Sequence, residues 1–157
     1  SVIGNMLGRK RGFCLWGMMT GWYFFWVLSR VSAHLKLSRG VRYLVHTALF
    51  LLFCAVTTPY LPEELPFKAF LHIVFSMAAA LCLCLYLFLA AWRLRKEDRT
   101  AGLVTLWCLA GILLVSAVLL ILVGIVSSAL EIFFTFSTVF LSRYLYGRTK
   151  RLISQSP

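Results

Sequence analysis

The sequence predicts an all-α fold, a polytopic transmembrane helical bundle that forms a single integral membrane domain over residues 1–157. Hydrophobic residues make up 61% of the chain and charged residues 13%, whereas soluble domains average about 45–50% and about 25%. The apolar residues also gather in stretches close to the roughly 20 residues with which a helix crosses a bilayer. The longest stretches do not alternate polar with apolar residues, which disfavours an outer-membrane barrel.

Five spans are expected, and they cover residues 13–28, 43–58, 69–92, 101–126 and 129–146. We expect helices because lipid offers no water to satisfy the backbone of an open strand. Short linkers separate the spans, and residues 147–157 form a basic cytoplasmic tail that we expect to be frayed. Small residues allow close helix packing, which we expect at Gly17, Gly21 and Gly111.

Basic residues concentrate in alternate linkers, and this pattern predicts the orientation. With the N-terminus outside, twelve of the 16 Lys and Arg residues lie in the cytoplasm, whereas the reverse orientation places twelve outside. The positive-inside rule therefore favours an outer N-terminus and a cytoplasmic C-terminus. The basic cluster at residues 9–11 then lies on the outer side. Either residues 13–28 lie in the membrane interface, or, as we favour, a further span precedes residue 1.

Ionisable residues at membrane depth are costly and mark functional sites. His72 lies about one turn into the third span and Glu131 about one turn into the fifth, both near the outer surface. Hydroxyl residues four positions further along each helix share their faces. The candidate outer-leaflet polar cluster consists of His72, Glu131, Ser76, Thr135, Thr57 and Thr58. In the alternative interpretation, Glu131 serves only its own helix N-terminus and His72 marks the headgroup boundary.

A collar of basic residues on the cytoplasmic side is the second candidate site. Its members are Arg39, Arg42, Arg93, Arg95, Lys96, Arg99 and Arg148. Such a collar attracts anionic lipid headgroups, and the orientation rule explains the same charges. Because the basic residues lie between spans, the net charge of +11 does not indicate nucleic-acid binding.

The sequence lacks the common motifs of catalytic, metal-binding and nucleotide-binding sites. The sequence contains no HExxH, GxSxG or P-loop motif, and the five cysteines lie inside apolar runs with no CxxC pair. We therefore predict no catalytic residues, no metal and no cofactor. The expected function is that of a non-catalytic scaffold, regulatory or lipid-interacting accessory subunit, with membrane lipids and a membrane-protein partner or homodimer as partners. The alternatives are a small transporter or channel subunit, and an intramembrane enzyme using His72 and Glu131.

Three segments resemble a known family. They are the opening SVIGNMLGRKRGFCLWGMMTGWYFFWVLSR, the stretch CAVTTPYLPEELPFKAFLHIVFSMAAA with His72, and LEIFFTFSTVF with Glu131. Together they resemble a bacterial six-span membrane family without an assigned activity, which is distantly similar to DRAM-type membrane proteins. The resemblance implies a first span that is missing here and a location in the bacterial plasma membrane. It also favours a regulator or scaffold over an enzyme.

Overall fold

The computed structural model describes residues 10–58, 63–123 and 128–155, and within these ranges it contains five α-helices and no strand. They are α2 (Lys10–His34), α3 (Arg39–Thr57), α4 (Pro66–Glu97), α5 (Arg99–Val123) and α6 (Ser128–Gln155). The all-helical prediction is confirmed. The first four residues of the sequence, on which part of the family resemblance rests, and residues 124–126 of the fourth predicted span lie outside the described residues.

The C-terminal segment corrects one expectation. Residues 147–155 continue helix α6 rather than fraying. The reason is packing, because Thr149 is buried and Leu152 packs against the hydrophobic core. The Thr149 hydroxyl also lies 3.2 Å from Nδ1 of His34, which ties the end of α6 to the end of α2.

Local signals set the helix boundaries. Ser38 caps α3, since its hydroxyl accepts a hydrogen bond from the backbone N–H of Val41 at 3.4 Å, as N-cap serines do. Pro66 opens α4, where the missing N–H of proline costs nothing. Asp98 separates α4 from α5 and accepts from the N–H of Ala101 at 2.9 Å. A single polar residue therefore ends one long helix and starts the next.

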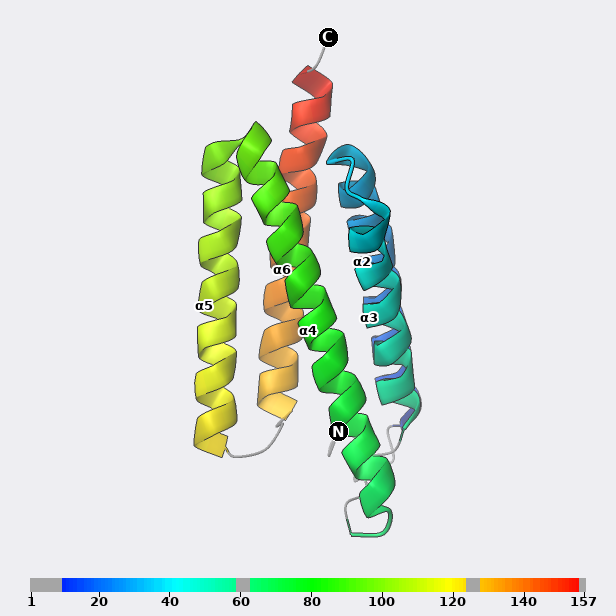
Figure 1. The fold of residues 1–157 in the computed structure, drawn as a ribbon. Coiled ribbons are helices and arrows are strands. Elements are labelled where there is room, and N and C mark those ends of the chain that lie inside the picture. Colours follow the sequence, from blue (N-terminus) through cyan, green and yellow to red (C-terminus); the bar gives the residue numbers. More distant parts are fainter. Residues whose placement is uncertain (1–9, 59–62, 124–127, 156–157) are drawn as a thin grey trace.

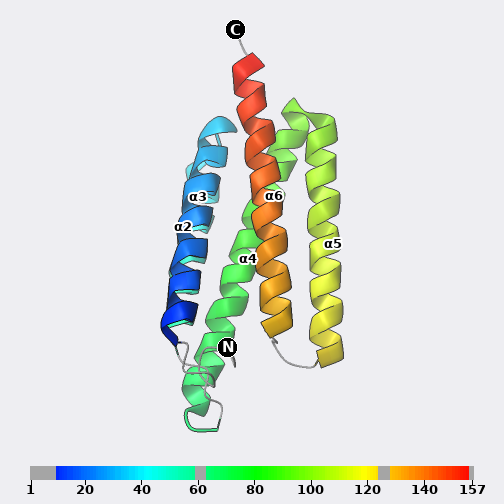
Figure 2. The ribbon, with the colours of Figure 1, turned by 180° about the vertical axis from the view of Figure 1, so that it is seen from behind.

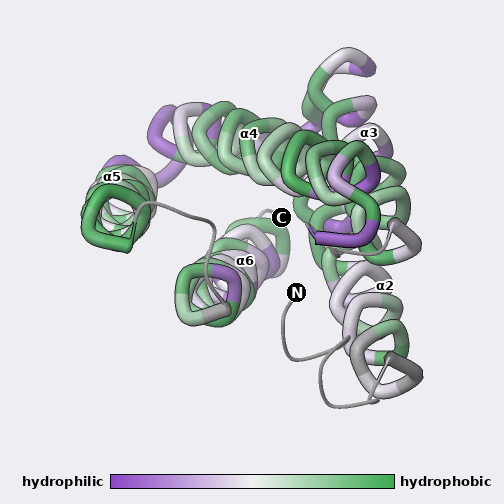
Figure 3. The backbone as a smooth tube through the Cα atoms, turned by 90° about the horizontal axis from the view of Figure 1, so that it is seen from below, coloured by the Kyte–Doolittle hydropathy of each residue, from purple (hydrophilic) through white to green (hydrophobic). Residues whose placement is uncertain are grey.

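The helices run alternately up and down (Figures 1 and 2). The α2–α3 turn, the α4–α5 turn and the C-terminus of α6 lie at one end of the bundle. We call this the basic end, because twelve of the 16 Lys and Arg residues belong to the segments that gather there. Viewed along the bundle, α2, α3, α4, α5 and α6 follow one another around a ring that closes between α6 and α2 (Figure 3).

The packed core fills the half of the bundle next to the basic end. Its most buried members come from α2, α4, α5 and α6, and they include Leu28, Val31, Leu87, Leu94 and Leu145. Tyr86, with no exposed surface, reaches from α4 toward α2, and its hydroxyl donates to the carbonyl of Leu28 at 2.8 Å. This contact links α4 to α2 within the packed core.

Large apolar side chains cover the outside of the bundle. Trp107, Ile121, Leu122 and Phe140 are each more than 70% exposed, which would be unfavourable in water. Helices α3, α4 and α5 are long and apolar enough to cross a membrane. Helices α2 and α6 have the length, but α2 carries more Trp, Tyr and Gly and α6 more Ser and Thr. The three apolar helices indicate a membrane location.

Candidate functional site

A cavity of about 690 Å³ occupies the half of the bundle away from the basic end. All five helices contribute to its wall, and its volume lies within the roughly 300–1,000 Å³ of small-molecule sites. The wall is mostly apolar, and in the part of the chain that the structure describes no Lys or Arg lines it. The wall of the cavity would therefore suit a predominantly hydrophobic ligand.

His72, on α4, is anchored to the end of α3. Its Nδ1 lies 2.8 Å from the carbonyl of Ala55 and 3.0 Å from that of Thr58. Carbonyl oxygens only accept hydrogen bonds, so Nδ1 carries the proton. The other ring nitrogen, Nε2, faces Glu131 of α6 at 4.0 Å from Oε1. The backbone of α3 thus fixes both the tautomer and the direction of the imidazole.

Glu131 is the more accessible partner of this pair. Its side chain is 30% exposed, against 7% for that of His72, and both residues line the cavity. The first turn of α6 contains Glu131, where the helix dipole stabilises a carboxylate. The structure thus brings the two ionisable residues of the predicted cluster together, and the carboxylate is the one that a ligand can reach.

Hydroxyl groups form a second level of the cavity wall. Ser76 and Thr135 lie one turn beyond His72 and Glu131 on the same helix faces, and both line the cavity. Ser116 of α5 lines it as well, and its buried hydroxyl has no hydrogen-bond partner among the described residues. Buried polar groups without a partner are rare in native structures. The Ser116 hydroxyl is therefore available to a ligand or a bound water.

Two members of the predicted cluster do not reach the cavity. The hydroxyl of Thr57 donates to the carbonyl of Phe53 at 2.9 Å, and that of Thr58 donates to Cys54 at 2.7 Å. Both therefore satisfy the carbonyls of the last turn of α3, as hydroxyls in helices often do. Thr58 still contributes through its backbone carbonyl, which accepts from His72.

Sequence reasoning missed Ser116 and Tyr86. The sequence did give one signal for Ser116, because it is a hydroxyl-bearing residue in an otherwise apolar run. Whether its side chain points into the bundle, however, depends on the rotation of α5 about its axis. Tyr86 follows the cavity-lining residues Leu83 and Cys84 along α4 and is fully buried. Because its single proton goes to the carbonyl of Leu28, the hydroxyl of Ser32, 2.9 Å away, donates to the tyrosine oxygen.

The predicted basic collar divides into two groups. Arg39, Arg42, Lys96 and Arg99 are exposed at the basic end. The other three are partly buried and have partners within the protein. Arg93 pairs with Glu97 at 3.5 Å, Arg95 lies over the ring of Trp92, and Arg148 pairs with Asp98. The side chains of the four exposed residues therefore lie at the surface of the basic end.

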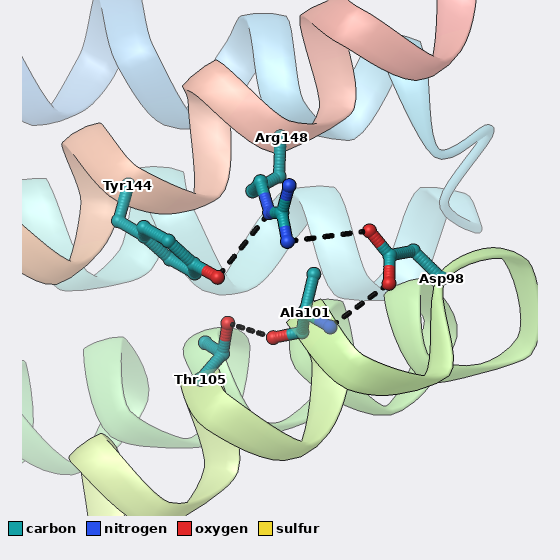
Figure 4. A network of polar contacts seen from close by, with 5 residues as sticks. All are labelled: Asp98, Ala101, Thr105, Tyr144 and Arg148. Atoms are coloured by element: carbon teal, nitrogen blue, oxygen red, sulfur yellow. Dashed lines mark hydrogen bonds and ion pairs between the residues drawn. The ribbon is translucent and has the colours of Figure 1, made fainter.

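Asp98 organises a polar network at the basic end (Figure 4). One carboxylate oxygen caps α5 through Ala101, and the other lies 3.8 Å from Arg148 of α6. Arg148 also donates to the hydroxyl of Tyr144 at 3.3 Å. The network therefore ties the α4–α5 turn to α6, which identifies a structural role for Arg148.

His34 lies at the same end, in the last turn of α2. Its ring stacks on that of Tyr146, with centroids 5.7 Å apart. Partial burial, followed by the positive charges of Arg30 and Lys150, lowers the pKa of His34 below its ordinary value. His34 is therefore mostly neutral at pH 7, and its contact with α6 does not depend on a charge.

Comparison of the chain with family models, curated proteins and solved structures gives no match. The resemblance noted from the sequence stays a prediction.

Proposed function

We propose that this chain is a multi-pass integral membrane protein that binds an amphiphile within its bundle, as a non-catalytic, lipid-interacting accessory or regulatory protein. The observation that carries the proposal is the cavity of about 690 Å³. His72 and Glu131 form its one ionisable pair, and the rest of the wall is mostly apolar. A ligand with one polar group and one hydrocarbon tail complements that arrangement.

Closure of the basic half supports a binding role. Tyr86, Leu87 and Leu94 are fully buried between the cavity and the basic end. A transported solute would need a polar path through this layer, so the transporter alternative requires the packed half to open. The enzyme alternative requires a water supply to His72 and Glu131 beside a reacting bond. Binding requires neither, and for this reason we prefer it.

The distribution of charge supports an orientation. We propose that the five helices cross a bacterial plasma membrane with the N-terminus outside, so that the basic end meets the cytoplasmic leaflet. The exposed Arg39, Arg42, Lys96 and Arg99 would then contact anionic headgroups. The family resemblance, with its scaffold and regulatory members, agrees with a membrane-protein partner or a homodimer.

The experiment is native mass spectrometry of the full chain in phosphatidylcholine nanodiscs with 1-O-decylglycerol as a neutral probe. Empty nanodiscs correct for partition of the probe into lipid. We expect saturable binding of one probe per protein. Ala117→Phe places a ring in the cavity wall, and we expect it to weaken binding about tenfold or more.

Ala110→Phe is the matched control. Ala110 lies on the same helix and is exposed, but it is not part of the cavity wall. We expect this variant to bind the probe like the unmodified protein. Probe binding that never saturates, or that survives unchanged in Ala117→Phe, would overturn the proposal.

A further inference from the structure

The chemistry of the headgroup can be inferred from the charges around the cavity. Glu131 is the one acidic residue among the described residues that line the cavity, and no Lys or Arg accompanies it there. A carboxylate in such a setting attracts a cation strongly, because the surrounding apolar wall screens charge weakly. An anionic headgroup at the same position would meet repulsion.

His72 does not offer an equivalent site for an anion. Its side chain is 7% exposed, its Nδ1–H is directed at the carbonyls of Ala55 and Thr58, and its Nε2 faces Glu131. A ligand entering from the cavity therefore meets the carboxylate before the imidazole. The polar end of the cavity presents negative charge to its occupant.

An aromatic pair contributes to the wall of the same cavity. Trp16 of α2 and Phe136 of α6 have ring centroids 5.6 Å apart, and both residues line the cavity. Phe136 follows Glu131 by five residues, which is about 7.5 Å along the helix axis. Aromatic faces attract alkylammonium groups through their quadrupole. The pair therefore complements the charge of Glu131 for a cationic headgroup.

We propose that the cavity selects a cationic amphiphile, with an alkylammonium headgroup at Glu131 beside Trp16 and Phe136 and a hydrocarbon tail in the apolar part. This inference rests on the proposed function and adds the class of ligand. The hydroxyls of Ser76, Thr135 and Ser116 lie between the two parts of the ligand. They suit the ether, ester or hydroxyl groups that often join a headgroup to a tail.

Glu131 is the one counterion for such a ligand among the described residues around the cavity. Apart from His72, the other titratable residue lining the cavity within the described ranges is Cys84, and Lys68 lies one turn before His72 with an exposed side chain. Neither supplies a second counterion for the ligand.

The test compares three probes with the same decyl chain in phosphatidylcholine nanodiscs. They are decyltrimethylammonium, 1-O-decylglycerol and decanoate, measured against empty nanodiscs. We expect decyltrimethylammonium to bind about tenfold more tightly than decylglycerol, since a partly exposed carboxylate retains only part of its Coulomb attraction. Decanoate should bind most weakly.

Glu131→Gln is the decisive variant, because it removes the charge and keeps the shape. It should lose the preference for decyltrimethylammonium over decylglycerol. Glu63→Gln, a change of the same kind at an exposed residue outside the cavity wall, should retain the preference. Thermal denaturation of Glu131→Gln beside the unmodified protein shows whether the variant is folded.

The outcomes separate the two proposals. Equal affinity for the cationic and neutral probes, or a preference that persists in Glu131→Gln, overturns the selectivity for cations and leaves an amphiphile-binding cavity in place. If none of the three probes binds saturably, the proposed function itself is wrong.

Discussion

Tyr86 illustrates how one residue separates the two halves of the molecule. Its ring is fully buried, and its hydroxyl bonds to the carbonyl of Leu28 and the hydroxyl of Ser32. In Tyr86→Phe the ring remains, but the buried carbonyl and hydroxyl lose their partner. We expect a loss of about 1–3 kcal/mol in the free energy of unfolding, measured by thermal denaturation in a neutral detergent.

Ser32→Ala provides the double-mutant cycle for this contact. Because both hydroxyls belong to one hydrogen-bonded chain, the double variant should lose less stability than the two single variants together. A coupling of about 0.5 kcal/mol or more is expected for residues in contact. Strict additivity would show that the contact contributes nothing to stability.

At the level of the helices, much of the fold could be predicted from the sequence, because apolar stretches of bilayer-crossing length define where helices lie. The rotation of each helix about its axis could not be predicted. Gly17 was expected at a close packing contact, and an added Cβ there would come within 2.7 Å of Val56. Gly111 was expected at another, yet nothing lies within 4 Å of the same position. Composition identifies small residues, and tertiary packing decides which of them are needed.

For the candidate site, too, some features could be predicted from the sequence and others could not. Depth along each helix sufficed to predict that His72 and Glu131 lie at one level, because a regular helix rises by about 1.5 Å per residue. The separation of Thr57 and Thr58 from the cavity depends on the side-chain rotamers at the end of α3. The contribution of Ser116 depends on which face α5 turns inward, and a uniformly apolar helix gives no periodic signal for this.

A substitution at Gly102 can test whether α4 and α5 approach each other closely. Gly102 is fully enclosed next to the α4–α5 turn, and an added Cβ would collide with the backbone of Arg95. Because backbone atoms cannot move aside as a side chain can, we expect Gly102→Ala to destabilise the protein by about 1–3 kcal/mol. The measurement is again thermal denaturation in a neutral detergent.

Gly111→Ala, on the same helix, is the matched control. The position is open, and alanine favours helix more than glycine by about 1 kcal/mol. We expect stability to be unchanged or slightly raised. If both variants lose the same stability, the turn does not bring α4 and α5 as close together as the structure places them.

For the molecule as a whole, the two halves have opposite properties. The half next to the basic end is densely packed and held by the Asp98–Arg148 and Tyr86 contacts, whereas the other half contains a cavity with one ionisable pair. The stability of the bundle and the proposed ligand binding should therefore depend on different parts of the molecule. Substitutions in the packed half should change unfolding, and substitutions in the cavity wall should change binding.

The charge difference between the two ends predicts the orientation in the membrane, because basic segments are retained in the cytoplasm. Single cysteines can report it after the native residues Cys14, Cys54, Cys82, Cys84 and Cys108 are replaced by alanine. Gly40→Cys lies at the basic end in open space, and Glu63→Cys lies at the opposite end; both positions are exposed. A membrane-impermeant maleimide should label Glu63→Cys in intact cells and Gly40→Cys only after permeabilisation.

The reverse labelling pattern would contradict the orientation, and labelling of both cysteines in intact cells would contradict a membrane crossing between them. If the positive charge of the basic end causes this orientation, removing part of that charge should make the orientation less uniform. Arg39→Gln combined with Arg42→Gln lowers the positive charge next to the reporter, so a fraction of Gly40→Cys should become accessible in intact cells. Lys68→Gln, which removes charge at the other end, should leave that cysteine protected, because it increases the difference between the two ends.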